Sequence, residues 1–390
     1  MIDLRNQPIK KGILIAFGEL FLKSSGVQKI FKEKLLANLS SFLKRKKIGF
    51  KIYPQRERIF VETANLKKAV GIIKHVFGIA WFSQAIFFEK ANLKEVADFV
   101  GQFYQDWIKK KETFALRIKK SSEIKLTHQK IIETIADKIQ RKVDLEKPQK
   151  EIFIEARKDG WFLYFKKQKG TGGLPVGSSG RVLTLISGGI DSPVAAFLMA
   201  KRGAENVWLH FHSFPLVSAA SIEKTKELAK VFLNYQPRLK VYFFPFGQLQ
   251  MAIKSKVPPR YRILLYRRLM LKIAQKIAQE ENCLALVTGE SLGQVSSQTL
   301  PNLLITNQKI NLPIFRPLIG WDKEEIIKLA QKIKTFPISL KPQEDCCTLF
   351  TPRHATAQGS LSEIEKMEKK LNLGRLIKKS FKEKTIFYLP

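Results

Sequence analysis

One short segment constrains the fold of this chain more than any other. In Leu185-Ile186-Ser187-Gly188-Gly189-Ile190-Asp191-Ser192-Pro193, an apolar strand meets a helix through two adjacent glycines. Glycines let backbone N–H groups approach an anion closely, and a helix N-terminus directs its dipole toward the same point. Ser187 and Ser192 add hydroxyl donors, and Pro193 suits the first turn of a helix. The segment predicts a phosphate cradle, distinct from the Walker loop, which needs Gly-Lys-Ser/Thr, and from a dinucleotide fingerprint.

Asp191 is the carboxylate of this cradle. A carboxylate beside phosphates can orient Mg²⁺ or the reacting nucleotide. The alternative is that Asp191 caps the helix that begins near Pro193, which is a common role for Asp. The sequence leaves both roles open, and we assign no metal ligand from it.

The second half of the chain alternates between strands and helices. Expected strands cover 182–186, 207–211, 240–244 and 285–288, with helices at 193–202, 221–233 and 262–280. Such alternation predicts a mainly parallel, doubly wound sheet, in which ligands bind at the carboxyl ends of the strands.

The first half has a different order. A strand at 13–17, a helix at 27–44, strands at 49–53 and 59–62, a helix at 66–77 and a strand at 80–88 give the β-α-β-β-α-β pattern of ferredoxin-like folds. There follow a helix at 92–108, a strand at 114–118, a helix at 127–143 and a hairpin around Asp159-Gly160. The Gly-rich stretch 169–177 is the best linker candidate. We expect a multidomain protein of α/β and α+β class.

Charge indicates the kind of partner. The 390 residues carry a formal net charge of +35, of which +19 lies in residues 1–170 and +16 in residues 171–390. A polyanion such as a nucleic acid would offset this self-repulsion, and a generically basic surface is the alternative. The sequence shows no signal peptide and no apolar stretch long enough for a transmembrane helix, so we expect a cytoplasmic protein without a membrane partner.

The cradle resembles the loop of the pyrophosphate-loop (PP-loop) ATPases, Ser-Gly-Gly-x-Asp-Ser, which binds ATP. Further segments, taken in order, extend this resemblance to the ThiI family of tRNA 4-thiouridine synthetases, which are tRNA sulfurtransferases. These segments are Gly18-Glu19-Leu20-Phe21-Leu22-Lys23, Gly170 to Gly177, Ser187 to Ala195, Val287 to Leu300, Arg316 to Gly320 and Asp345-Cys346-Cys347.

The resemblance implies three domains. Residues 1–63 would form an N-terminal ferredoxin-like domain, with an end at about residue 88 as the alternative, and residues 64–168 would form a THUMP RNA-binding domain. After the linker at 169–177, residues 178–390 would form the PP-loop ATP pyrophosphatase domain. The chain ends at Pro390, which leaves no room for the rhodanese domain of many family members and puts the family's link to thiamine biosynthesis in doubt here.

The resemblance also implies an ATP site. Its residues are Leu185, Ile186, Ser187, Gly188, Gly189, Asp191, Ser192, His210, Phe211, Arg267, Gly289 and Gln298. Two alternatives stay open: His210 could be an interior histidine with satisfied hydrogen bonds, and Arg267 could lie on a solvated helix face.

Cysteine chemistry completes the expected site. Of the three cysteines, Cys346 matches the family's catalytic cysteine, and Cys347 is a candidate persulfide or resolving thiol. Cys283 precedes an apolar strand and is expected to be structural. The alternative for the pair is two packed small side chains.

The expected function is that of an ATP-dependent tRNA sulfurtransferase. With ATP and Mg²⁺, such an enzyme adenylates O4 of uridine 8 in tRNA and replaces it with persulfide sulfur, for which a cysteine desulfurase is the expected donor. Catalysis would require Cys346 and Asp191, and a homodimer is an open possibility. The alternatives are a PP-loop ligase or amidating enzyme that acts on a small substrate, and a non-catalytic tRNA-binding protein.

Overall fold

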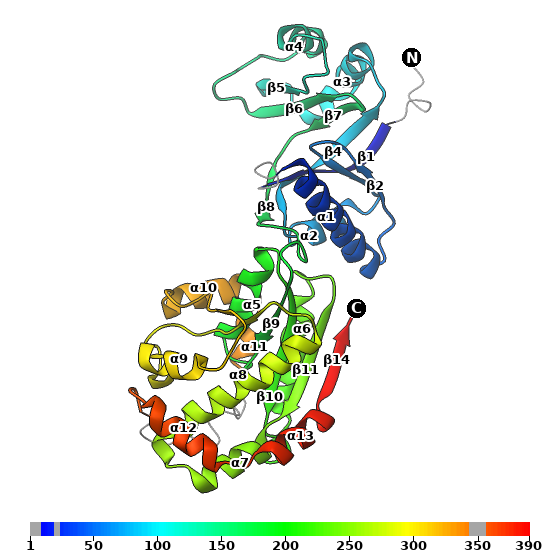
Figure 1. Cartoon of the computed structure of the whole chain (residues 1–390). Helices are drawn as coiled ribbons and strands as arrows, with labels where there is room; N and C mark the ends of the chain where they lie inside the picture. The colour runs from blue at the N-terminus through cyan, green and yellow to red at the C-terminus, as the bar shows by residue number, and fades with distance from the viewer. Residues whose placement is uncertain (1–8, 19–23, 343–355) are drawn as a thin grey trace. The chain divides into compact units, whose positions relative to one another are not determined.

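The computed structural model describes residues 9–18, 24–342 and 356–390 (Figure 1). The chain divides into two compact units, one up to Leu174 and the other from Pro175. Cys346 and Cys347 lie outside the described residues, as do positions 19–23 of the N-terminal motif. Among the described helices, none is long and apolar enough to cross a membrane.

The first unit begins with the predicted β-α-β-β-α-β order. Its elements are β1 (Ile9–Phe17), α1 (Ser25–Arg45), β2 (Lys51–Pro54), β3 (Ile59–Glu62), α2 (Leu66–Ile73) and β4 (Ile79–Glu89). Asn65 holds the N-cap position of helix α2, and Ala69 and Ile73 of this helix share one core with Leu35 of α1 and Ile13 of β1. The ferredoxin-like pattern is thus confirmed, with α2 as part of its core.

The rest of this unit extends the same sheet. It consists of α3 (Leu93–Trp107), β5 (Phe114–Lys120), α4 (His128–Ala136), β6 (Lys150–Arg157), β7 (Gly160–Tyr164) and β8 (Gln168–Gly172). All eight strands belong to one sheet of order β2-β3-β1-β4-β7-β6-β5, and β8 pairs with β4.

Helix α4 is shorter than the predicted helix at 127–143, which was wrong in its second half. Thr127 caps its start by accepting a hydrogen bond from the Lys130 N–H. Turn hydrogen bonds continue to Ile139, and the backbone then pairs with β5: Phe114 N–H donates to the carbonyl oxygen of Lys142, and Asp144 N–H donates to that of Phe114. Pairing with the start of β5 therefore replaces the helical hydrogen bonds.

The Gly-rich stretch expected to be a linker contains strand β8. A Cβ atom at Gly170 would lie 2.1 Å from the carbonyl oxygen of Ile79 in β4. Glycine is needed at this position because two strands approach closely, which is a different reason from chain flexibility.

An aromatic cluster and an ion network fill the face of this sheet opposite the helices. Phe60 and Phe162 lie 5.7 Å apart between ring centroids. Glu155, only 1% exposed, accepts hydrogen bonds from Arg58, Arg157 and Tyr164. Burial disfavours its charge, but the two guanidinium groups outweigh that cost and lower the pKa of Glu155.

The second unit has the predicted doubly wound architecture. Its sheet elements and the helices between them are β9 (Arg181–Leu185), α5 (Asp191–Lys201), β10 (Glu205–His212), α6 (Ala220–Phe232), β11 (Leu239–Pro245), α7 (Gly247–Lys256), α8 (Arg262–Glu280), β12 (Ala285–Val287), α9 (Leu300–Asn307) and β13 (Ile314–Phe315). The C-terminal part adds α10 (Lys323–Lys332), α11 (Phe336–Ser339), α12 (Leu361–Lys370), α13 (Gly374–Glu383) and β14 (Thr385–Leu389).

The sheet of this unit has the order β13-β12-β9-β10-β11-β14. Strands β9 to β13 pair in parallel, and β14 is antiparallel to β11 at the edge. The mainly parallel sheet is therefore confirmed. Because β9, β10 and β12 run in the same direction, their carboxyl ends meet at one edge, where the cradle begins.

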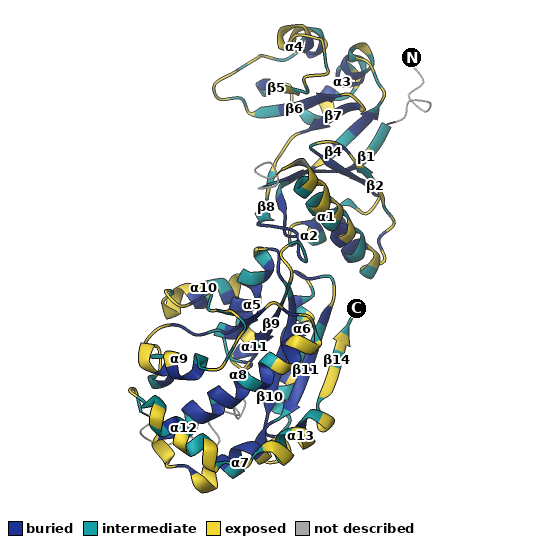
Figure 2. Ribbon diagram, viewed as in Figure 1, coloured by how far each residue is buried: buried dark blue, intermediate teal, exposed yellow. Residues whose placement is uncertain are grey.

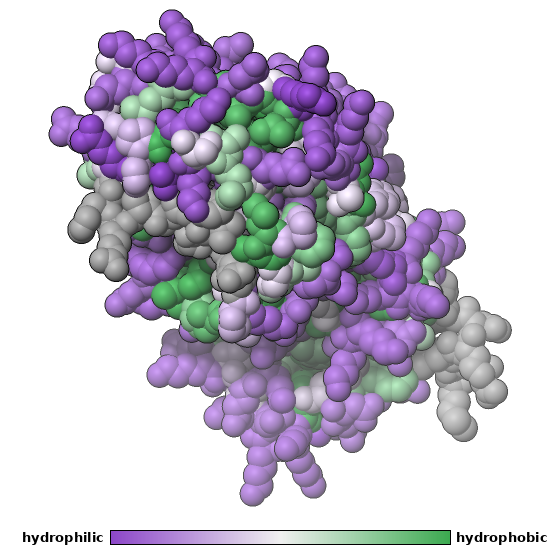
Figure 3. All heavy atoms as spheres, turned by 90° about the horizontal axis from the view of Figure 1, so that it is seen from below, coloured by the Kyte–Doolittle hydropathy of each residue, from purple (hydrophilic) through white to green (hydrophobic). Residues whose placement is uncertain are grey.

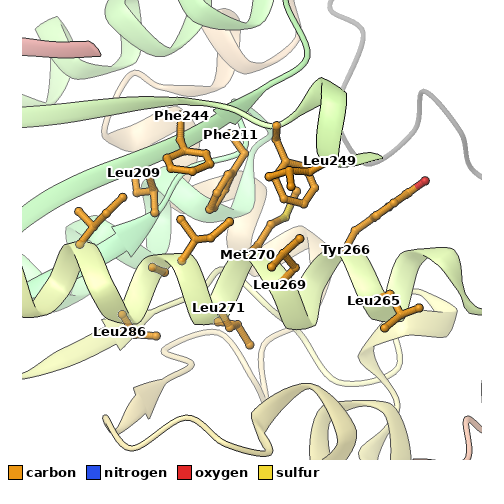
Figure 4. Close-up of a cluster of buried hydrophobic side chains, with 14 of the residues drawn as sticks. Leu209, Phe211, Phe244, Leu249, Leu265, Tyr266, Leu269, Met270, Leu271 and Leu286 are labelled. Atoms are coloured by element: carbon orange, nitrogen blue, oxygen red, sulfur yellow. The ribbon is translucent and has the colours of Figure 1, made fainter. Parts of the chain in front are cut away.

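Helices cover both faces of this sheet. Leu209, Phe211 and Phe244 pack with α8, as Figure 4 shows. Trp208, one position from Leu209, points to the opposite face and contacts Phe232 of α6. Burial is concentrated in these strands and in α8, whereas α12, α13 and β14 expose many residues (Figure 2). In the view of Figure 3, hydrophilic side chains cover most of the surface, interspersed with apolar patches.

Candidate nucleotide site

The predicted cradle is the loop between β9 and α5, whose places in the second unit are labelled in Figure 1. Its two serines organise it: Ser187 N–H donates to Ser192 Oγ at 3.1 Å, and Gly189 N–H donates to Ser187 Oγ at 3.3 Å. Gly188 has φ +83°, a left-handed conformation that favours glycine. The loop therefore depends on the residue types that predicted it.

Asp191 is the first residue of α5, and Ile190 holds the N-cap position. The Asp191 carboxylate accepts a hydrogen bond from Gln294 Nε2 at 3.1 Å and forms an ion pair with Lys323. Of the two roles that the sequence left open, helix capping is therefore not the one observed. The carboxylate instead connects α5 with the loop after β12 and with the first residue of α10.

Lys323 is a site residue that the sequence reasoning missed. Asp322 and Glu325 form a capping box, which places Lys323 at the start of α10. That box was visible in the sequence and predicts the helix start. The approach of this helix to the cradle depends on tertiary packing, which no local pattern predicts.

Gly289, just after β12, lies against the start of α5. A Cβ atom at this position would lie 2.7 Å from the Ser192 nitrogen and 2.8 Å from its Cα. Only glycine allows the two backbones to come this close.

Arg267 of α8 contacts the segment that follows β12. The alternative that Arg267 lies on a solvated face of its helix is therefore wrong. It donates to the carbonyl oxygen of Ser297 at 2.9 Å and to its Oγ at 2.8 Å, and it forms an ion pair with Glu290. Its side chain is 17% exposed.

Glu290 is a second residue that the sequence reasoning missed. It is 5% exposed, lies between Arg267 and Arg316, and accepts a hydrogen bond from Thr288 Oγ1 at 2.8 Å. One carboxylate between two guanidinium groups leaves net positive charge at this edge of the sheet, which suits an anionic ligand.

Gln298 stabilises the loop that follows β12. Its Oε1 accepts a hydrogen bond from the Ser291 N–H at 3.2 Å, and its carbonyl oxygen accepts one from Gly293 at 3.1 Å. The side-chain amide of Gln298 would contact a ligand by donating hydrogen bonds from its N–H groups.

His210 is an interior histidine whose ring nitrogens both have partners, as the open alternative proposed. Nδ1 lies 2.8 Å from the carbonyl oxygen of Ile186, so it carries the proton, and Nε2 accepts from Ser221 Oγ at 3.2 Å. Burial lowers its pKa to about 4, which keeps the ring neutral at pH 7. Its side chain therefore fixes the strand end at Ile186.

The remaining predicted residues have distinct environments. Phe211 is 7% exposed and packs on Phe244 and Phe246. Ile186 donates its N–H to Leu209, which ties the end of β9 to β10, and Leu185 is partly buried against the core. Burial raises the pKa of the Cys283 thiol to about 12, which suits a structural role.

These features define the class of the protein. A serine- and glycine-rich loop lies at the carboxyl end of a parallel strand. Lys323 forms an ion pair with Asp191 of this loop, and Arg267 and Arg316 form ion pairs with Glu290, which follows β12. The second unit is thus a nucleotide-binding α/β domain of the PP-loop class.

Known proteins extend this assignment to the whole chain. Residues 177–373 match the family described as thiamine biosynthesis protein (ThiI), residues 12–83 the ThiI ferredoxin-like domain and residues 90–166 the THUMP domain. A probable tRNA sulfurtransferase of Thermoanaerobacter sp. (strain X514) is 38% identical over 383 residues, which cover 96% of this chain and 98% of that protein. One from Thermus thermophilus is 48% identical over 244 residues, 63% of this chain and 60% of that protein.

Among solved structures, a 4-thiouridine synthetase in complex with RNA and ATP matches with a TM-score of 0.86 and 30% identity. The match covers 98% of this chain and 100% of that one. The chain therefore belongs to the ThiI family of tRNA sulfurtransferases.

Proposed function

We propose that this protein is an ATP-dependent tRNA sulfurtransferase that converts uridine 8 of tRNA to 4-thiouridine. The observation that carries the proposal is the intact Ser187–Ser192 cradle, with Asp191 between Lys323 and Gln294, in a chain that aligns with tRNA sulfurtransferases over almost its full length. The proposed ATP contacts are those expected from the sequence, with the His210 side chain in a supporting role.

In the first step, O4 of the uridine attacks the α-phosphorus of ATP and pyrophosphate leaves. The cradle would bind the phosphates through backbone N–H groups and the Ser187 and Ser192 hydroxyls. Lys323, beside Asp191, and Arg267, beside Ser297, would stabilise the negative charge that develops on the leaving group. Adenylation turns a poor leaving oxygen into a good one.

Asp191 fits the donor set that Mg²⁺ prefers, because Mg²⁺ is commonly held by one or two carboxylates together with substrate phosphates. When bound, the ion would neutralise phosphate charge. Lys323 keeps the Asp191 carboxylate oriented at the start of α5.

In the second step, the terminal sulfur of a cysteine persulfide attacks C4, and AMP leaves with the former O4. A second thiol then attacks the inner sulfur, which frees the C4 thiolate and leaves a disulfide that a thiol reductant must reduce. We propose Cys346 and Cys347 for the two thiols. We further propose a cysteine desulfurase as the source of the persulfide and, from the location of tRNA, the cytoplasm as the site of the reaction. A homodimer stays a prediction.

The test of the function measures pyrophosphate release and 4-thiouridine in the same reaction, with and without tRNA. Release that depends on tRNA supports the proposal, release without tRNA would indicate a small-molecule ligase, and no release would indicate a non-catalytic binding protein. Asp191→Asn should lower tRNA-dependent release by about 100-fold, as expected for loss of one electrostatic group at a transition state.

A matched control for this substitution is Glu324→Gln. Glu324 lies next to Lys323 on α10, its side chain is 83% exposed, and its ion-pair partner is Lys328 within the same helix. This variant removes a nearby carboxylate without touching the cradle, so its rates should equal those of the unmodified protein. Full activity of Asp191→Asn would refute the role of Asp191.

The cysteine pair has its own test. Cys347→Ser should release almost no 4-thiouridine, because no neighbouring thiol can free the product from the Cys346 persulfide adduct. The measurement is 4-thiouridine formed per enzyme in the presence of a cysteine desulfurase and cysteine. Multiple turnovers without added reductant would exclude the pair mechanism.

A further inference from the structure

Asn302, in the first turn of α9, is a polar side chain with no exposed surface. Both ends of its amide have partners. Nδ2 donates to the carbonyl oxygen of Ser296 at 2.7 Å and to that of Thr356 at 2.9 Å, while Oδ1 accepts from the Gly359 N–H at 3.0 Å. The side chain therefore connects two segments that are far apart in the sequence.

On one side of Asn302 lies the turn that belongs to the nucleotide site. Ser296 opens the 3₁₀ turn Ser296–Gln298, which contains the predicted ATP contact Gln298. The same turn contains Ser297, whose carbonyl oxygen and hydroxyl bind Arg267. A shift of Ser296 would thus move two side chains of the proposed ATP site, Gln298 and Arg267.

On the other side lies the segment Thr356–Gly359, where the described chain resumes after Cys346 and Cys347. Two further hydrogen bonds hold this segment: Thr356 N–H donates to the carbonyl oxygen of Arg260, and Thr299 Oγ1 donates to that of Ala357 at 2.6 Å. Gly359 fits closely, since a Cβ atom there would lie 2.7 Å from Leu264 Cδ1 and 3.2 Å from Asn302 Oδ1.

The choice of asparagine at this position needs an explanation. Asn is a weak helix former, and a buried amide is costly unless its hydrogen bonds are satisfied. An apolar residue would pack in α9 at lower cost but could not connect the two segments. The full set of hydrogen bonds indicates that the connection itself is what this residue provides.

We propose that Asn302 is a positioning residue that couples ATP use to sulfur transfer, by fixing the nucleotide-site turn relative to the segment that follows the cysteine pair. The inference rests on the proposed function. When the coupling is weakened, water attacks C4 of the adenylated uridine in place of the persulfide. Uridine is then regenerated with the oxygen of water, AMP leaves, and ATP is consumed without thiolation.

The experiment compares pyrophosphate released with 4-thiouridine formed in one reaction of the full chain with unmodified tRNA, ATP, a cysteine desulfurase, cysteine and a thiol reductant. Asn302→Asp keeps the size of the side chain but places an oxygen against two carbonyl oxygens. We expect pyrophosphate released per 4-thiouridine to rise about tenfold, in the usual range of coupling between sites.

Thr306→Val is the matched control. Thr306 has no exposed surface, lies on the same helix, and among the described residues donates its hydroxyl to the carbonyl oxygen of Leu303 within that helix. This variant removes a buried hydrogen bond without touching either segment, so its ratio should stay at the value of the unmodified protein.

A second variant keeps the inference testable if Asn302→Asp does not fold. Gly359→Ala places a methyl group close to Asn302 Oδ1 and so disturbs the hydrogen bond between Gly359 and Asn302 from the other segment. It should also raise the amount of pyrophosphate released per 4-thiouridine. Equal loss of both products, or an unchanged ratio in a folded variant, would show a merely structural role and overturn the inference. Failure of the unmodified protein to form 4-thiouridine would instead refute the proposed function.

Discussion

A methyl group at position 289 would collide with the backbone of Ser192 at the start of α5. Because backbone atoms cannot turn away as a flexible side chain does, either the loop after β12 or the cradle must move. Gly289→Ala should therefore lower kcat/KM for ATP by about 100-fold, since small displacements of reacting groups are that costly. The measurement is the ATP dependence of tRNA-dependent pyrophosphate release.

Gly374→Ala serves as the control, since a Cβ atom at Gly374 meets no atom within 4 Å. Its kinetics should match those of the unmodified protein. If Gly289→Ala behaved in the same way, the close approach to Ser192 would have no part in ATP binding.

Single residues differ in how far the sequence can predict their roles. Gly188 and Ser187 act within one loop, so a local motif was sufficient to identify them. Glu290 and Lys323 act through contacts between distant segments, Glu290 with two arginines and Lys323 with Asp191. Glu290 lies within one of the family segments and Lys323 within a capping box, but neither local pattern indicates the distant partner of the residue, which is why the sequence did not assign them to the site.

At the scale of elements, strands and helices with a clear apolar period were predicted well. Helix α8 has the predicted bounds, and β9 to β12 differ from prediction by only a few residues, because their buried positions recur at regular spacing. The errors arose where tertiary contacts outweigh local preference. Residues 142–144 pair with Phe114 and do not continue α4, and pairing with β4 makes Gln168–Gly172 a strand that the sequence did not predict. The boundary between the two units, after Leu174, lies within the stretch predicted to be a linker.

At the scale of the molecule, positive charge is shared by both units. Residues 171–174 carry no charge, so the counts of +19 and +16 also hold for the two units. For the proposed tRNA substrate, binding should release counterions from many phosphates. We expect tRNA affinity of the full chain to fall by about 1,000-fold between about 50 and 200 mM salt.

This prediction is checked by titrating labelled tRNA at several salt concentrations. The KM for ATP, measured in parallel, is the internal control, because a single nucleotide releases few counterions and its binding should change far less. Salt-independent tRNA affinity would contradict a phosphate-based interface.

Strand β4 has a consequence for any attempt to divide the first unit. The ferredoxin-like match ends at residue 83 and the THUMP match begins at residue 90, so the junction falls within or at the end of β4, which runs from Ile79 to Glu89. One edge of β4 pairs with β1, and the other with β7 and β8. A deletion or gene fusion that separates the two parts would leave a long strand edge without its partner, and such edges promote aggregation. The two parts are therefore best transplanted into another protein together.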